Sequence, residues 1–226
     1  MKKSPDRKTS VGDAISRFAA AIFLGLAAAL LSSCESTRGK YGPGAGFFDN
    51  VVVDAGHGGG DRGAKSCRGV PEKALTLDTA QRLAGVLRAN GLQVVETRKG
   101  DHAVPLCNRT AISNRSGQAV FVSVHFNWVK RSGPHGIEIY YNNIRSVRLA
   151  ANILKETLGA YHTSNRGIKK RGLYVLRNNR RPAVLCELGF ISSPGENRCV
   201  QSPAVRQHLA ELVAAGILAE RAGRIP

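Results

Sequence analysis

The chain has 226 residues, of which 33 are Lys or Arg and 16 are Asp or Glu, so its formal net charge at pH 7 is +17. An excess of this size usually reflects an anionic partner, such as nucleic acid, lipid head groups or a charged envelope polymer. The basic residues are scattered, without aromatic interleaving or zinc-finger spacing, so nucleic acid is not the expected partner.

The first 33 residues have the pattern of a bacterial export signal. Basic residues up to Arg17 precede the uncharged run Phe18 to Leu31, which is short for a membrane span. The following Ser-Ser-Cys34 completes a sequence that resembles a lipoprotein cleavage box, in which the cysteine becomes the acylated N-terminus. A plain signal peptide and an uncleaved anchor are the alternatives. We expect a protein held by lipid at a membrane on the periplasmic side of the cell envelope.

Residues 34–48 contain Ser, Thr, Gly, Pro and Lys with little that can pack, which predicts a tether. The remaining segment, 49–226, is long enough for one domain with a sizeable core. Its four cysteines are Cys67, Cys107, Cys186 and Cys199. Export permits disulfides, whose pairing the sequence leaves open, and the absence of a Cys-x-x-Cys pair argues against a thiolate zinc site. Cys186 stands in an apolar run and is expected to pack in the core.

An apolar β-branched run, Val51 to Val53, opens the domain and predicts a buried strand. It ends in Asp54-Ala-Gly-His57, followed by a cluster of glycines. Glycines allow a tight turn and leave His57 without bulky neighbours, where a metal or a substrate can approach. His57 is therefore the first functional candidate.

The glycines also match a different kind of site. Gly58-x-Gly60-x-x-Gly63 has the spacing of a dinucleotide-binding loop after a first strand. However, the next helix is expected to begin near Glu72, so no helix N-terminus is available at the last glycine to bind a pyrophosphate. The first acid at the end of a second strand, Glu96, lies 33 residues beyond Gly63, where about 20 are needed. Nucleotide binding is therefore not expected.

Hydrophobic periodicity predicts the other elements. Helices are expected over 73–90, 108–117, 146–162 and 203–221, and strands over 92–98, 119–127, 136–141, 173–177 and 183–191. Together with the first strand this is an α/β single domain, with an approximately six-stranded, mostly parallel or mixed sheet and helices on both faces.

Three more residues are candidates for a functional role. Glu72 falls in the first turn of a helix, where an acid is as often only a partner for the helix dipole. His125, like His57, lies near a strand end. Glu187 stands inside an apolar strand, where an unpaired carboxylate is costly, so it is either in an ion pair with an arginine or a metal ligand or general base with a raised pKa. Two histidines and two glutamates supply the parts of a hydrolytic zinc site.

Several motifs over residues 51–221 resemble those of the zinc-dependent N-acetylmuramoyl-L-alanine amidases of bacterial cell-wall remodelling. They are Val-Asp-Ala-Gly-His57, Glu72-Lys73, Thr97-Arg98-x-x-Asp101, Leu106-x-x-Arg109, Ser123-Val-His125-Phe-Asn127, Asn165-Arg166-Gly167 and Pro182-Ala-Val-Leu-Cys-Glu187-Leu-Gly-Phe190. The resemblance implies that His57, Glu72 and His125 bind one Zn²⁺. It also implies that Glu187 is the general base and acid for hydrolysis of the amide between N-acetylmuramic acid and L-alanine in peptidoglycan.

Further expectations concern substrate and partners. Asn127, Trp128 and Arg166 are candidate substrate-binding residues, although Trp128 is equally compatible with packing on the rim of the site. Some members of the family carry a long helix that plugs the site. Here only four residues separate Tyr141 from Ser146, so we expect no obligatory activator. We also expect a monomer. The rival interpretations are another zinc hydrolase of envelope polymers, such as a carboxypeptidase or deacetylase, and a non-catalytic, lipid-anchored wall-binding protein.

Overall fold

The computed structural model describes residues 44–131, 133–224 and 226. The predicted export signal, Cys34 and the first part of the predicted tether lie outside these residues. The last part of that tether, 44–48, packs on the domain: Phe48 is buried, and the backbone N–H of Ala45 donates a hydrogen bond to Oε1 of Glu220 at 2.6 Å. The folded part of the chain therefore includes these residues.

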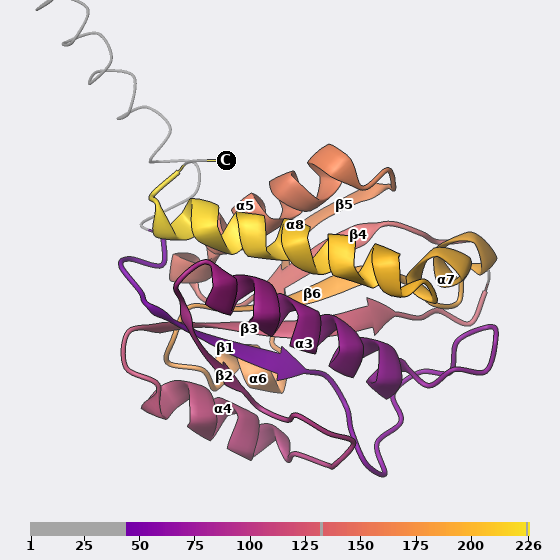
Figure 1. The fold of residues 1–226 in the computed structure, drawn as a ribbon, viewed down its shortest axis with the longest axis horizontal. Helices are drawn as coiled ribbons and strands as arrows, with labels where there is room; N and C mark the ends of the chain where they lie inside the picture. The colour runs from indigo at the N-terminus through magenta and orange to yellow at the C-terminus, as the bar shows by residue number, and fades with distance from the viewer. Residues whose placement is uncertain (1–43, 132, 225) are drawn as a thin grey trace, which may run out of the picture. The chain divides into compact units, whose positions relative to one another are not determined.

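Six strands form one mixed sheet, in the order β2-β1-β3-β6-β4-β5 (Figure 1). The strands are β1 (Asn50–Ala55), β2 (Gln93–Glu96), β3 (Ala119–Asn127), β4 (Ile137–Tyr141), β5 (Asn165–Lys170) and β6 (Ala183–Phe190). Neighbouring strands are parallel except for β4 and β6, which are antiparallel. The predicted fold class is confirmed.

Helices cover both faces of the sheet. They are α3 (Glu72–Ala89), α4 (Leu106–Arg115), the 3-10 turn η1 (Ile144–Ser146), α5 (Val147–Ala160), α6 (Tyr174–Arg177), α7 (Pro194–Val200) and α8 (Pro203–Arg221). Helices α3, α5 and α8 pack together on one face, where α3 and α8 lie in front of the sheet in Figure 1, and α4 and α6 lie on the other. Among the described residues no helix has both the length and the apolar character to cross a bilayer.

Strand β3 shows why the core has two sides. Val120, Val122 and Val124 face the large cluster under α3, α5 and α8, whereas Phe121 faces a smaller cluster beside α4 and α6. Successive side chains of a strand point to opposite faces, so a central strand covered on both faces is apolar throughout. The same alternation places His125 on the side of the smaller cluster.

One predicted strand is wrong. Residues 173–177 contain the one-turn helix α6 instead, with Val175 and Leu176 buried against the sheet. A short apolar run does not distinguish a strand from a buried helical turn, because neither shows a full period. The sixth strand is β5, which is mostly polar. It lies at the edge of the sheet, where a strand needs little apolar surface and basic side chains prevent pairing with other chains.

The four cysteines of the domain are free thiols in the structure. Cys67, Cys107 and Cys199 are exposed, and Cys186 is buried on β6. The prediction that Cys186 is a core thiol is confirmed. Burial raises the pKa of Cys186, which keeps it uncharged.

Candidate metal centre

The structure brings together the three residues that were predicted to bind a metal. His57 lies just beyond the end of β1, Glu72 is the first residue of α3, and His125 lies near the end of β3. Each offers a ligand atom, and these atoms all lie within 4.8 Å of one another. Nε2 of His57 is 3.1 Å from Oε2 of Glu72, and Nδ1 of His125 is 3.0 Å from Oε1 of Glu72. Glu72 therefore faces the histidines and is not only a partner for the helix dipole.

The charges of these groups depend on one another. Burial opposes ionisation of Glu72, but hydrogen bonds with His125 and His57 hold its pKa well below the usual range. Burial likewise opposes the charge on His57, yet hydrogen bonds with Glu72 and Asp61 raise the pKa of His57 to about 9. Two imidazoles and one ionised carboxylate form a donor set that suits a zinc ion with one coordination position left open.

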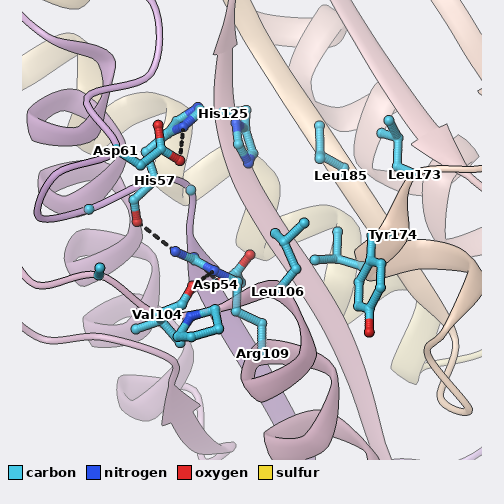
Figure 2. Close-up of a pocket in the computed structure, with 15 residues that line it drawn as sticks. Asp54, His57, Asp61, Val104, Leu106, Arg109, His125, Leu173, Tyr174 and Leu185 are labelled. Atoms are coloured by element: carbon cyan, nitrogen blue, oxygen red, sulfur yellow. Dashed lines mark hydrogen bonds and ion pairs between the residues drawn. The ribbon is translucent and has the colours of Figure 1, made fainter.

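Asp61 orients His57, a role that the sequence analysis missed. Its Oδ2 lies 2.9 Å from Nδ1 of His57 (Figure 2). Its Oδ1 accepts a hydrogen bond from the backbone N–H of Gly63 at 3.0 Å. A carboxylate on the second ring nitrogen of a metal-binding histidine fixes its tautomer and orientation. The sequence feature that could have revealed this role is an acid four residues after His57, within the glycine loop.

Two glycines are required by the close packing of the candidate metal-binding side chains. A Cβ added at Gly56 would lie 2.3 Å from the ring of His125. At Gly63, where φ is +63°, a Cβ would lie 2.6 Å from His57 and 2.7 Å from Glu72. Gly56 thus leaves room for the ring of His125, and Gly63 leaves room for His57 and Glu72.

Two buried arginines hold the backbone that carries His57, whose φ of 62° is unusual for a residue other than glycine. Nη2 of Arg109 donates to the carbonyl oxygen of His57 at 2.6 Å, and Nη2 of Arg98 donates to that of Gly56 at 2.8 Å. Arg109 is itself paired with Asp54 at 2.6 Å. These contacts give a physical role to motif residues whose function the sequence alone did not reveal.

Glu187 lies beside this cluster, opposite His125 on the neighbouring strand β6. Its Oε2 is buried and has no hydrogen-bond partner within the described part of the chain, so the alternative of an arginine ion pair is not supported. Burial raises the pKa of Glu187 to about 7, and nearby Glu72 and Glu138 act in the same direction, while the two histidines oppose them. A carboxyl group with such a pKa can accept and return a proton near neutral pH.

A second buried acid, Glu138, was not singled out from the sequence. It lies opposite Glu187 on β4 and accepts a hydrogen bond from Nδ2 of Asn127 at 2.7 Å. Its carboxylate also contacts the Tyr140 hydroxyl, Nζ of Lys169 and, at 3.4 Å, Nε of Arg166. Although burial opposes ionisation, these bonds lower the pKa of Glu138. Glu138 could have been found from the sequence by the same feature as Glu187, which is an acid inside an apolar strand.

A cavity of about 430 Å³ opens beside His57 and His125 (Figure 2). Its walls on the side of α4 and α6 are mainly apolar and include Leu106, Leu173 and Tyr174, which are partly exposed. Apolar walls with a few convergent polar groups are typical of a ligand site. Trp128 follows the end of β3 with 48% of its surface exposed, and its role in substrate binding stays a prediction.

Comparison with known proteins gives a consistent result. Residues 51–219 match the family model described as N-acetylmuramoyl-L-alanine amidase. The chain is 33% identical over 171 residues to YqiI of Bacillus subtilis, covering 74% of this chain and 82% of YqiI. It is 36% identical over 173 residues to the probable cell wall amidase LytH of Staphylococcus aureus, covering 74% of this chain but only 56% of LytH. The solved structure of the N-acetylmuramoyl-L-alanine amidase AmiC2 of Nostoc punctiforme superposes with a TM-score of 0.73 at 36% identity, covering 77% of this chain and 97% of AmiC2.

Proposed function

Since the chain belongs to the N-acetylmuramoyl-L-alanine amidase family, we propose that it uses one zinc ion to hydrolyse the amide bond between N-acetylmuramic acid and L-alanine in peptidoglycan. The observation that carries this proposal is the convergence of His57, Glu72 and His125 within 4.8 Å, with Glu187 on the strand next to His125. The chain spans about half the length of LytH, so the activity is proposed for this domain alone.

The donor set fits the ion that the family uses. His57 and His125 would each supply one ring nitrogen and Glu72 one carboxylate oxygen, with Asp61 holding His57 from behind. A bound Zn²⁺ supplies a Lewis acid that polarises the amide carbonyl and lowers the pKa of water. The ring of His57 must be neutral to bind the ion, so the proton that it carries in the metal-free protein has to leave.

Glu187 is proposed to move the protons of the reaction. Its ionised carboxylate accepts a proton from the attacking water, and the same group then donates it to the departing amine of L-alanine. In the metal-free protein burial raises the pKa of Glu187 to about 7, so the same carboxyl group can act as a base and then as an acid near neutral pH. Asn127 and Trp128 follow His125 closely in the chain and remain proposed substrate-binding residues.

We place this activity in the cell envelope, where peptidoglycan is found. The predicted export signal and acylated Cys34 would hold the domain at a membrane, and the excess of basic residues favours contact with an anionic surface. The proposal includes a monomer that acts on peptidoglycan without an obligatory activator and does not bind nucleic acid.

The experiment is digestion of purified peptidoglycan by the zinc-loaded protein, with mass spectrometry of the products. We expect free muramic lactyl groups and intact stem peptides that begin with L-alanine, and no release after the metal is chelated. Products cut within the stem peptide would indicate a carboxypeptidase, and loss of acetate would indicate a deacetylase. Binding to the wall without any release, even with added zinc, would identify a non-catalytic wall-binding protein.

A further inference from the structure

Arg166 is held in a fixed orientation beside the proposed base. Its Nε lies 3.4 Å from Oε2 of Glu138, and its guanidinium carbon lies 4.9 Å from the centre of the Phe190 ring. Within the described part of the chain Nη1 and Nη2 of Arg166 donate no hydrogen bond, and 35% of the side chain is exposed. An arginine that is stacked on a ring and bonded through Nε presents its remaining donors as a fork that matches a carboxylate.

The surroundings of Arg166 strengthen the attraction for an anion. The chain has no acid between Glu156 and Glu187, and this interval contains seven basic residues: Arg166, Lys169, Lys170, Arg171, Arg177, Arg180 and Arg181. The first four lie on or next to β5, and the other three lie on or after α6. Among the described residues, the acid paired with Arg166 is Glu138, which is also neutralised by Lys169. The border of the site along β5 is therefore basic, whereas the cavity walls that include Leu106 and Leu173 are apolar.

The distance from the base to the arginine matches a short piece of peptide. Phe190, which the guanidinium covers, pairs with Asn127, whereas Glu187 pairs with His125 two residues earlier on β3, so the bulge in β6 brings Phe190 to about 7 Å from Glu187 along the strand. Two residues of extended peptide span about 7 Å. A substrate whose amide nitrogen is next to Glu187 would thus bring its second residue close to Arg166. In peptidoglycan that residue is a glutamate linked through its side chain, so its α-carboxylate is free unless it is amidated.

We propose that Arg166 binds the α-carboxylate of the second residue of the stem peptide, so that the enzyme selects peptidoglycan in which this group is not amidated. The inference rests on the proposed amidase function. It assigns the acidic peptide to the basic border of the site and leaves the apolar border, next to α4 and α6, for the uncharged sugar. Glu138 then acts as a positioning residue, because it aligns Arg166 through Nε.

The test uses two synthetic muramoyl tetrapeptides that differ only in the second residue, which carries either a free α-carboxylate or a carboxamide. We expect the zinc-loaded wild-type protein to cleave the carboxylate form with a kcat/KM roughly tenfold higher, as is typical for a bond between charged groups. In Arg166→Gln this preference should disappear, because kcat/KM falls about tenfold more on the carboxylate form than on the carboxamide form. Arg166→Lys keeps the charge without the fork and should recover only part of the preference.

Lys170→Gln is the matched control, since Lys170 is an exposed cation on the same strand and makes no ion pair within the described residues. It should keep most of the preference, because Lys170 adds only to the general positive charge of this border. Equal cleavage of the two substrates by the wild-type protein, or an equal loss on both in Arg166→Gln, would overturn the inference while leaving the amidase function intact. Failure of the wild-type protein to cleave either substrate or whole peptidoglycan would instead refute the proposed function.

Discussion

His125 and Glu187 lie directly opposite each other on the parallel strands β3 and β6. Neighbouring strands are about 4.8 Å apart, so this register places the proposed base next to a proposed metal ligand. A shift of one residue would turn Glu187 to the other face of the sheet, because side chains alternate along a strand. The pairing between these two strands is therefore what joins the acid–base group to the candidate metal centre.

This arrangement predicts that replacing Glu187 and replacing the candidate metal ligand His57 have different effects. Glu187→Gln should lower kcat by a factor of about 10² to 10⁴, the usual contribution of a general acid–base group, because the amide cannot accept the proton of water. The variant should keep its zinc, since Glu187 is not among the three clustered ligands. Release of stem peptides and metal content by mass spectrometry are the measurements.

His57→Ala provides the comparison and should lose both zinc and activity. A Glu187→Gln protein that releases stem peptides at a near-normal rate would refute the role of this carboxylate.

Zinc affinity should increase with pH. Below pH 9 the metal-free protein carries a proton on His57, whose pKa is raised to about 9, and zinc must displace that proton. Between pH 7 and 9 we expect the affinity to rise about tenfold per pH unit, corresponding to one proton released. Competition with a chelator of known affinity at several pH values measures this slope. Asp61→Asn should flatten it, because Asp61 helps to keep His57 protonated.

Gly56 should be intolerant of any side chain. In Gly56→Ala the new Cβ would lie 2.3 Å from the ring of His125, so the ring has to move away from Glu72 and zinc binding should weaken at least about tenfold, as for other changes that disturb ligand orientation. Gly60→Ala is the control, because a Cβ at Gly60 meets no atom within 4 Å. Titration with zinc should separate the two variants. Equal zinc affinities of the two variants would show that the ring of His125 can move without weakening zinc binding.

Asp54 should stabilise the domain more than a comparable surface acid. Its ion pair with Arg109 is almost completely buried, and it also accepts hydrogen bonds from Thr97 and Ser123. Asp54→Asn leaves the charge of Arg109 unpaired and should lower the free energy of unfolding by about 3 kcal/mol.

Asp49→Asn is the matched control. Asp49 also pairs with an arginine at 2.6 Å, but this pair is partly exposed to solvent, so its loss should cost less than about 1 kcal/mol. Urea unfolding of the two metal-free variants compares these values. A smaller loss of unfolding free energy in Asp54→Asn than in Asp49→Asn would show that the Asp54–Arg109 pair does not stabilise the loop that carries His57.

Much of this protein follows from the sequence, because local patterns report local structure. The β-branched run before His57 and the alternation through His125 identified central strands, and an acid in an apolar strand drew attention to Glu187. The same patterns failed where the signal was short or polar: residues 173–177 form a helical turn, and the polar segment 165–170 is the edge strand. In both places, contacts with the rest of the sheet decide the conformation, and these contacts are not visible in a short window of sequence.

The tertiary structure alone decided which side chains meet. His57, Glu72 and His125 are far apart in the sequence, and their convergence depends on the order of β1 and β3 in the sheet and on where α3 begins. The partners of Arg98, Arg109 and Glu138 were likewise not accessible from their own segments. Periodicity shows which face of a helix or strand is buried. Long-range pairing between strands determines what that face contacts, and the chemistry of the site depends on these contacts.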